Sequence, residues 1–250
     1  MGDTVILTGE TFDLSRVPDS ARVLRLHTVR KAHLGKLAGL QDLPLRELEL
    51  RWISAPDLEA LPLPACLQTL KIWHSPKLRS LRGVERATAL RTLVWTDTGM
   101  LEDAMPLAQV PEFRELRIEG GPGSSQKVAD LAFLADLRLE SLTLRGIAGA
   151  SLDLSPVAAL AEGTRIEIHG PSFKPEELAK VAAAHPPVLD DLMALRDYPP
   201  SLGLACKTCG GVRKELFLRG KKGLWCPVCE AKGLTAQLNA FRTLVEAARA

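Results

Sequence analysis

Residues 45–50 read Leu-Arg-Glu-Leu-Glu-Leu, so Leu45, Leu48 and Leu50 follow the pattern L-x-x-L-x-L. The pattern recurs at residues 67–72, 90–95, 113–118 and 139–144, with Ile, Trp or Phe at some apolar positions, and weaker copies lie at 24–26 and 166–168. Intervals of 22 to 26 residues separate the central apolar residues of the copies, which are Leu24, Leu48, Leu70, Leu93, Leu116, Leu142 and Ile166. This regular interval predicts stacked structural repeats.

Each copy predicts one short strand and one returning segment. Side chains alternate along a strand, so residues 48 and 50 point to one side while residues 47, 49 and 51 point to the other. Between two copies, Leu34, Leu37, Leu40 and Leu43 are spaced by three residues, which predicts short helices or 3₁₀ turns. One repeat cannot close a core alone, but stacked neighbours can.

These residues make the chain similar to the leucine-rich-repeat family over roughly residues 4–170. Pro44, Pro64 and Pro111 lie just ahead of three expected strands, like the Leu-Pro pairs of bacterial members. The resemblance implies an α/β solenoid of about seven repeats that uses its strand face to bind partners.

One family feature is largely missing. The family places Asn or Cys shortly after each strand, where the side chain hydrogen-bonds neighbouring backbone. We therefore expect irregular solenoid curvature, because the corresponding residues here are Ile53, Ser75, Thr98, Gly121 and Ile147.

The outward-facing strand positions carry alternating acidic and basic side chains, so no field of one sign builds up. Trp73 lies near the middle of this face and is a candidate interface hot spot. An ordinary soluble surface, with Trp73 packed against a neighbouring Trp, is the alternative. The candidate partner-binding residues are Arg51, Lys71, Trp73, Arg117 and Arg145.

The regular period stops after residue 170, which predicts three parts: a solenoid at 1–170, a helical cap and linker at 171–202, and a C-terminal module at 203–250. Within the cap, Pro175 opens a helix that ends before Pro186, and a second short helix spans 188–196. A final helix from residue 236 to 249 has one apolar face formed by Leu234, Leu238, Phe241 and Val245.

The C-terminal module contains two C-x-x-C pairs with sixteen residues between them: Cys206, Cys209, Cys226 and Cys229. Zn²⁺ accepts four thiolates in a tetrahedron. The pairs, with a strand–turn–strand pattern between them, resemble the zinc-ribbon family over residues 204–232, although Glu230 stands where many ribbons have Gly. The resemblance implies one structural zinc ion, closed to substrate. A redox C-x-x-C, a rubredoxin-like iron site and disulfides fit this spacing less well, and we expect Cys66 to be a buried core residue.

Net charge is +2, so the whole chain has no general attraction to nucleic acid or acidic lipid. The C-terminal module is locally basic, which allows nucleic-acid contact through Lys207, Arg213, Lys214, Arg219, Lys221 and Lys222. The sequence shows neither a membrane-spanning stretch nor a secretory signal, and the cysteine pairs fit a reducing compartment. Cytoplasmic location is the expectation.

Catalytic motifs and metal-ligand histidine spacings are missing from the sequence. Residues 120–127 do not match a phosphate-binding loop and suggest a flexible insertion. We therefore expect a non-catalytic cytoplasmic protein-binding adaptor with a structural zinc module. The alternatives are a nucleic-acid-associated factor using the basic module, or an immunity or antitoxin-like protein that masks a toxin. The sequence sets no oligomeric state.

Overall fold

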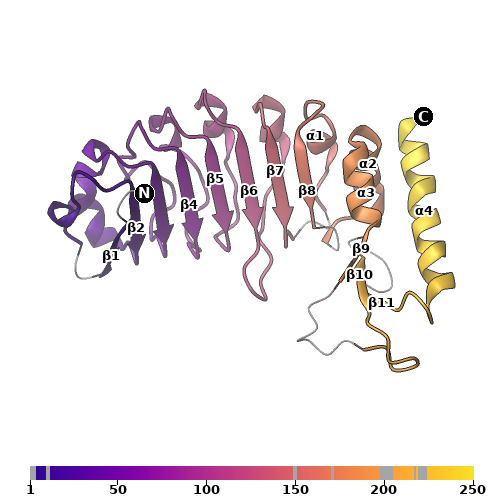
Figure 1. Cartoon of the computed structure of the whole chain (residues 1–250). Coiled ribbons are helices and arrows are strands. Elements are labelled where there is room, and N and C mark those ends of the chain that lie inside the picture. Colours follow the sequence, from indigo (N-terminus) through magenta and orange to yellow (C-terminus); the bar gives the residue numbers. More distant parts are fainter. Residues whose placement is uncertain are drawn as a thin grey trace.

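The computed structural model describes residues 4–9, 12–148, 151–169, 172–197, 205–216, 218 and 224–250. The architecture is mixed α/β: a parallel sheet takes up the first two thirds of the chain, and helices with a small second sheet follow it (Figure 1). The large sheet is an open row and does not curl (Figure 1).

The eight strands of the large sheet lie side by side in chain order, each hydrogen-bonded to the next. They are β1 (Thr4–Thr8), β2 (Val23–His27), β3 (Glu47–Arg51), β4 (Thr69–Trp73), β5 (Thr92–Thr96), β6 (Glu115–Glu119), β7 (Ser141–Arg145) and β8 (Arg165–Ile168).

The strands are in register, so equivalent residues of successive repeats are direct neighbours. Leu48 of β3 pairs with Leu24 of β2 on one side and with Leu70 of β4 on the other. The same row continues through Leu93, Leu116, Leu142 and Ile166, so the seven central residues of the sequence pattern are neighbours in one parallel sheet. β1 was not predicted as a strand; it extends the row by Val5.

The predicted alternation of side chains is confirmed on the inner side of the sheet. Leu48, Leu50, Leu70 and Ile72 are fully buried, and Trp95 joins them at a position that is leucine or isoleucine in the neighbouring strands. The apolar residues of the returning segments, such as Leu37 and Leu40, complete the same core. Burial of this apolar row is the main stabilising term of the sheet.

Short 3₁₀ helices form most of the returning segments, as the spacing of three residues predicted. They are η2 (Leu14–Arg16), η3 (Lys31–Asp42), η4 (Val84–Arg86), η5 (Met105–Gln109) and η6 (Ala132–Asp136). Four of them have three to five residues, and η3 has twelve.

Two buried polar side chains hydrogen-bond the backbone of neighbouring segments near the strand ends. The Ser75 hydroxyl accepts a hydrogen bond from Ile53 N (3.1 Å) and donates one to Trp73 O (2.9 Å). The Gln126 side chain accepts from Thr98 N and donates to Gly99 O and Lys127 O. Gln126 therefore fixes one end of the segment that the sequence suggested to be a flexible insertion.

A group of helices follows the large sheet. α1 (Ser155–Ala158) precedes β8, α2 (Pro175–Ala184) begins and ends as predicted, and α3 (Pro186–Met193) lies against β8. The second helix is shorter than expected, because residues Leu195–Asp197 form a strand, β9, instead of its last turn. The final helix, α4 (Ala231–Arg249), begins five residues before the expected 236.

The second sheet has three antiparallel strands and joins the cap region to the C-terminal module. β10 (Lys214–Leu216) pairs with β11 (Leu224–Trp225) on one side and with β9 on the other. The part of the chain expected to be a linker therefore supplies a strand. α4 packs along α2, with Leu234, Phe241 and Val245 buried on the expected face (Figure 1).

The expectation for Cys66 was wrong: its side chain is exposed, with Sγ 3.4 Å from Leu45 O. The inward position belongs to the next residue, Leu67, which is fully buried, so Cys66 remains at the surface of the turn. None of the described helices is long and apolar enough to span a membrane.

Truncation of a core leucine should separate inward from outward strand positions. Leu70→Ala should lower the free energy of unfolding by roughly 2–5 kcal/mol, because it leaves a cavity between stacked layers. Thr69→Ala, one residue away on the outer side, should change it by less than about 0.5 kcal/mol. Urea unfolding of both variants measures the difference, and equal losses would contradict the assigned faces.

Candidate metal centre and outer sheet face

The first cysteine pair lies on a tight turn. Cys206 N donates to Gly211 O (2.8 Å) and Gly210 N donates to Cys206 O (2.8 Å). These two hydrogen bonds close a turn in which the chain reverses its direction between Cys206 and Val212. Gly210 has a φ of 72°, in the left-handed region where glycine has no side-chain clash. The turn presents Cys206 and Cys209 to the same side.

The second pair connects strand β11 to helix α4. Cys226 directly follows the strand, and Glu230 N donates to Cys226 O (3.0 Å) at the start of the helix. The Glu230 carboxylate accepts a hydrogen bond from Cys226 N (2.8 Å). Glu230, a departure from the usual glycine, thus closes the turn with its own side chain.

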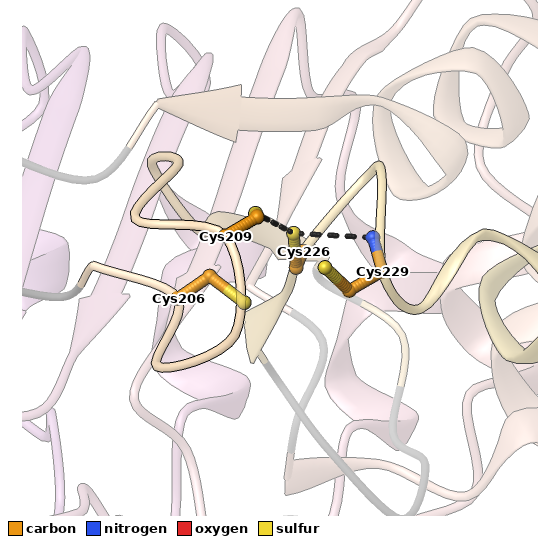
Figure 2. A group of neighbouring side chains, drawn as sticks. All are labelled: Cys206, Cys209, Cys226 and Cys229. Carbon is orange, nitrogen blue, oxygen red and sulfur yellow. Dashed lines mark hydrogen bonds between the residues drawn. The ribbon is translucent and has the colours of Figure 1, made fainter.

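The four cysteine side chains come together at one place (Figure 2). Their sulfur atoms all lie within 4.8 Å of one another, and Cys209 Sγ is 3.6 Å from Cys226 Sγ. In a tetrahedral site with metal–sulfur bonds of 2.3 Å, the sulfurs are about 3.8 Å apart. The four residues could therefore hold one metal ion, and the donor set suits a soft or borderline metal.

Backbone N–H groups around the site favour thiolate sulfur. The N–H groups of Cys209 and Thr208 lower the pKa of the Cys206 thiol to about 6. The Cys229 N–H points at Cys226 Sγ (3.4 Å). The neighbouring Cys209 sulfur and burial raise the pKa of the Cys229 thiol to about 12. Four sulfurs this close cannot all ionise unless a cation compensates their charge.

Loss of a cysteine should abolish metal binding. Purified chain should contain one metal ion, and Cys206→Ser or Cys229→Ser should lose it, because neither leaves four thiolates. Bound metal should also be released as the pH falls, since protons compete for the sulfurs. Elemental analysis measures both effects, with Cys66→Ser as the matched control that keeps its metal. Metal retained by Cys206→Ser would contradict the site.

Glu230 should support the site without being a ligand. Glu230→Ala should weaken metal binding by about 10- to 100-fold, the usual effect of removing a group that orients a ligand. Glu246→Ala, an exposed acidic residue of the same helix, should leave it unchanged. Competition with a chromophoric chelator measures the metal affinity of each variant. If Glu230→Ala bound metal as tightly as the parent chain, the hydrogen bond from Cys226 N to Glu230 would be unimportant for metal binding.

The outer face of the large sheet carries the five predicted partner-binding residues, and each has a close neighbour. Lys71 Nζ lies 2.7 Å from Glu47 Oε1 and Arg117 Nη2 lies 2.7 Å from Glu119 Oε1. Arg145 is paired with Glu167, and Arg51 with Glu49. The face is therefore electrically balanced, as the sequence suggested.

Some outward-facing side chains are more covered than their position predicts. Glu49 is only 4% exposed because Arg25, His27 and Arg51 surround its carboxylate. Thr96 is also buried.

Trp73 lies at the centre of an aromatic and cationic cluster. Its ring is 5.6 Å from the Arg51 guanidinium carbon, within cation–π range. It is partly exposed and makes a tilted ring contact with His74. Thr96 pairs with Trp73 in the sheet, and within the described residues Trp73 Nε1 and Thr96 Oγ1 are buried atoms with no hydrogen-bond partner.

Trp52 was missed as a site residue, although it is the exposed aromatic of this surface. It follows β3 directly, is 49% exposed, and stacks on His74 with ring centroids 5.7 Å apart. His74 Nδ1 lies 2.6 Å from Asp97 Oδ2. Bonds from the Ser124 hydroxyl and from His74 lower the pKa of Asp97. The alternating pattern of a strand ends with the strand, so it does not predict the exposure of the residue that follows.

Two of the basic residues considered for nucleic-acid contact are ion-paired within the chain. Arg213 Nη2 is 3.9 Å from Glu230 Oε1, and Lys214 Nζ is 3.2 Å from Asp197 Oδ1. Lys207 is exposed, whereas Arg219, Lys221 and Lys222 lie outside the described residues. The described part of the module therefore has less free positive charge than its sequence indicates.

The chain matches no protein-family model and no curated protein.

Proposed function

We propose that this chain is a leucine-rich-repeat solenoid protein without catalytic activity that recognises a protein partner through the outer face of its large sheet. The observation that carries the proposal is the cluster of Trp52, Trp73, His74 and Arg51 on that open face. Trp and Arg are the residues most enriched at interface hot spots. Because the charges around the cluster are balanced, a protein partner with both charge signs suits this face better than a polyanion.

The solenoid interpretation is supported by the strand register. Seven predicted positions at intervals of 22 to 26 residues form one continuous row, and short 3₁₀ segments return the chain between strands. This is the arrangement that stacked repeats require.

We further propose that Cys206, Cys209, Cys226 and Cys229 hold one structural Zn²⁺ ion in a zinc-ribbon module. Two tight turns, four converging sulfurs and an antiparallel hairpin support this assignment. Zn²⁺ would add stability to a module with a small core, and four protein ligands leave no position for a substrate. Free thiol ligands of this kind persist in a reducing compartment, so we place the protein in the cytoplasm.

Capture of partners from the native cell tests the choice of partner. Immobilised protein should retain a protein partner after nuclease treatment, because the proposed contact does not involve nucleic acid. Loss of all partners with nuclease would favour the nucleic-acid alternative through the basic module. A toxin among the captured proteins would identify the masking role considered above.

Truncation of the aromatic cluster should weaken binding to the purified partner. Trp73→Ala and Trp52→Ala should each cost about 2 kcal/mol or more, as hot-spot residues do. Thr69→Ala, on the same face but outside the cluster, serves as the control and should have little effect. Calorimetric titration measures all three. Binding that survives both tryptophan changes but disappears without residues 203–250 would contradict the proposed face.

A further inference from the structure

The outer face of the large sheet has a polar hollow over strands β6, β7 and β8, which lie apart from the aromatic cluster of β3 and β4 (Figure 1). Its volume of about 240 Å³ is the share of roughly eight water molecules in the liquid, so the hollow has room for a small organic molecule. Six residues line it: Glu115, Arg117, Ser141, Thr143, Arg165 and Glu167.

The strand register gives this hollow a floor and two walls. Two rows of paired residues cross it from β6 through β7 to β8: Glu115, Ser141 and Arg165, then Arg117, Thr143 and Glu167. The short hydroxyl side chains of β7 therefore form the floor, and the long charged side chains of β6 and β8 form the walls. Each row has one anionic and one cationic wall residue, so the lining carries no net charge.

The floor contains a hydroxyl that the described chain does not use. Thr143 is only 6% exposed, and its hydroxyl has no hydrogen-bond partner within the described residues. In contrast to the enclosed Thr96 Oγ1, the Thr143 oxygen can be reached from the hollow. Polar groups in such covered positions are nearly always hydrogen-bonded, so this hydroxyl indicates that a molecule in the hollow completes its bonding.

Two of the four charged wall residues are also available. Arg117 and Glu167 are ion-paired with residues outside the hollow. Arg165 and Glu115 have no ion-pair partner in the described part of the chain, and Glu115 accepts only a hydrogen bond from Thr92 Oγ1 (3.2 Å). One strand lies between them, so their Cα atoms are about 10 Å apart. An available cation and an available anion therefore face each other across the floor.

We propose that the hollow binds a free α-amino acid with a short polar side chain. The ligand's carboxylate pairs with Arg165, whose guanidinium matches two carboxylate oxygens. Its ammonium pairs with Glu115, and its side chain hydrogen-bonds the Thr143 hydroxyl. A ligand with a single charge would leave Arg165 or Glu115 unpaired, and an apolar ligand would leave the hydroxyl unbonded. The hollow does not include the Trp73 cluster, so this inference is separate from the proposed recognition of a protein.

L-Serine is the probe, because it is small and carries both charges and a hydroxyl. Amide spectra of the isotope-labelled full chain, recorded by NMR during a titration, should show saturable shifts at Thr143 and its neighbours. N-acetyl-L-serine lacks the ammonium and L-serinamide lacks the carboxylate. Each should bind more than about tenfold more weakly than L-serine, because each loses one hydrogen-bonded charge pair.

Substitutions in the walls and the floor should weaken binding to different extents. Arg165→Gln and Glu115→Gln should each weaken L-serine binding by more than about tenfold. Thr143→Val should weaken it by about 3- to 10-fold, because a neutral hydrogen bond contributes less. Thr69→Val, the same change on β4 outside the hollow, is the matched control and should bind like the parent. Dispersed amide spectra must show every variant folded.

Each result decides the matter. Absence of saturable L-serine binding to the folded chain would overturn the proposal, and so would equal affinity for the two blocked probes. Binding that Arg165→Gln and Glu115→Gln leave unchanged would overturn the assigned charge pairs. Equal effects of Thr143→Val and Thr69→Val would overturn the position of the site. Because these experiments use no partner protein, their outcome is independent of whether the outer face binds one.

Discussion

The in-register alignment of the eight parallel strands is the constraint on which the rest of this structure depends. The core is a thin layer between one sheet and a line of short 3₁₀ segments, so each repeat completes its burial only against its neighbours. A shift of one residue in any strand would turn its inward apolar residues to solvent and its outward-facing residues into the core. The outer face therefore has fixed rows of side chains, and the cluster around Trp73 is a consequence of that order.

The same alignment explains the unusual backbone at the strand ends. Thr28, Trp52, His74 and Asp97 each follow a strand directly and each has a positive φ, between 47° and 62°. This conformation is costly for residues other than glycine and is retained where the surroundings impose it. Here the hydrogen bonds of the sheet continue through it, as in the bond from Trp52 N to Trp73 O. Because neighbouring strands end at equivalent residues, the four residues with positive φ form a second row next to the strand rows. Trp52 is thereby held against His74.

Repeat positions, inward faces, α2 and the cysteine cluster were all predictable, because each depends on spacing along the chain. Features that depend on strand pairing or on particular side-chain contacts were not. The sequence predicted helix for Leu195 and Arg196, because only pairing with β10 makes these residues extended. Glu49 looked exposed because its three basic neighbours lie on β2 and β3. Glu230 was seen only as a departure from glycine, and its bond to Cys226 N depends on the geometry of the turn.

The cysteine cluster and the large sheet are connected through the elements between them, which limits how independent the C-terminal module is. β9 enters the small sheet from the cap side, and α4 begins at the second cysteine turn and packs along α2. If the four cysteines hold a metal ion, its loss would release the start of α4, and with it the contacts that Phe241 and Val245 make in the common core. The large sheet retains its own apolar row up to β8. We therefore infer that metal loss spreads as far as the cap helices, while the outer face keeps its shape.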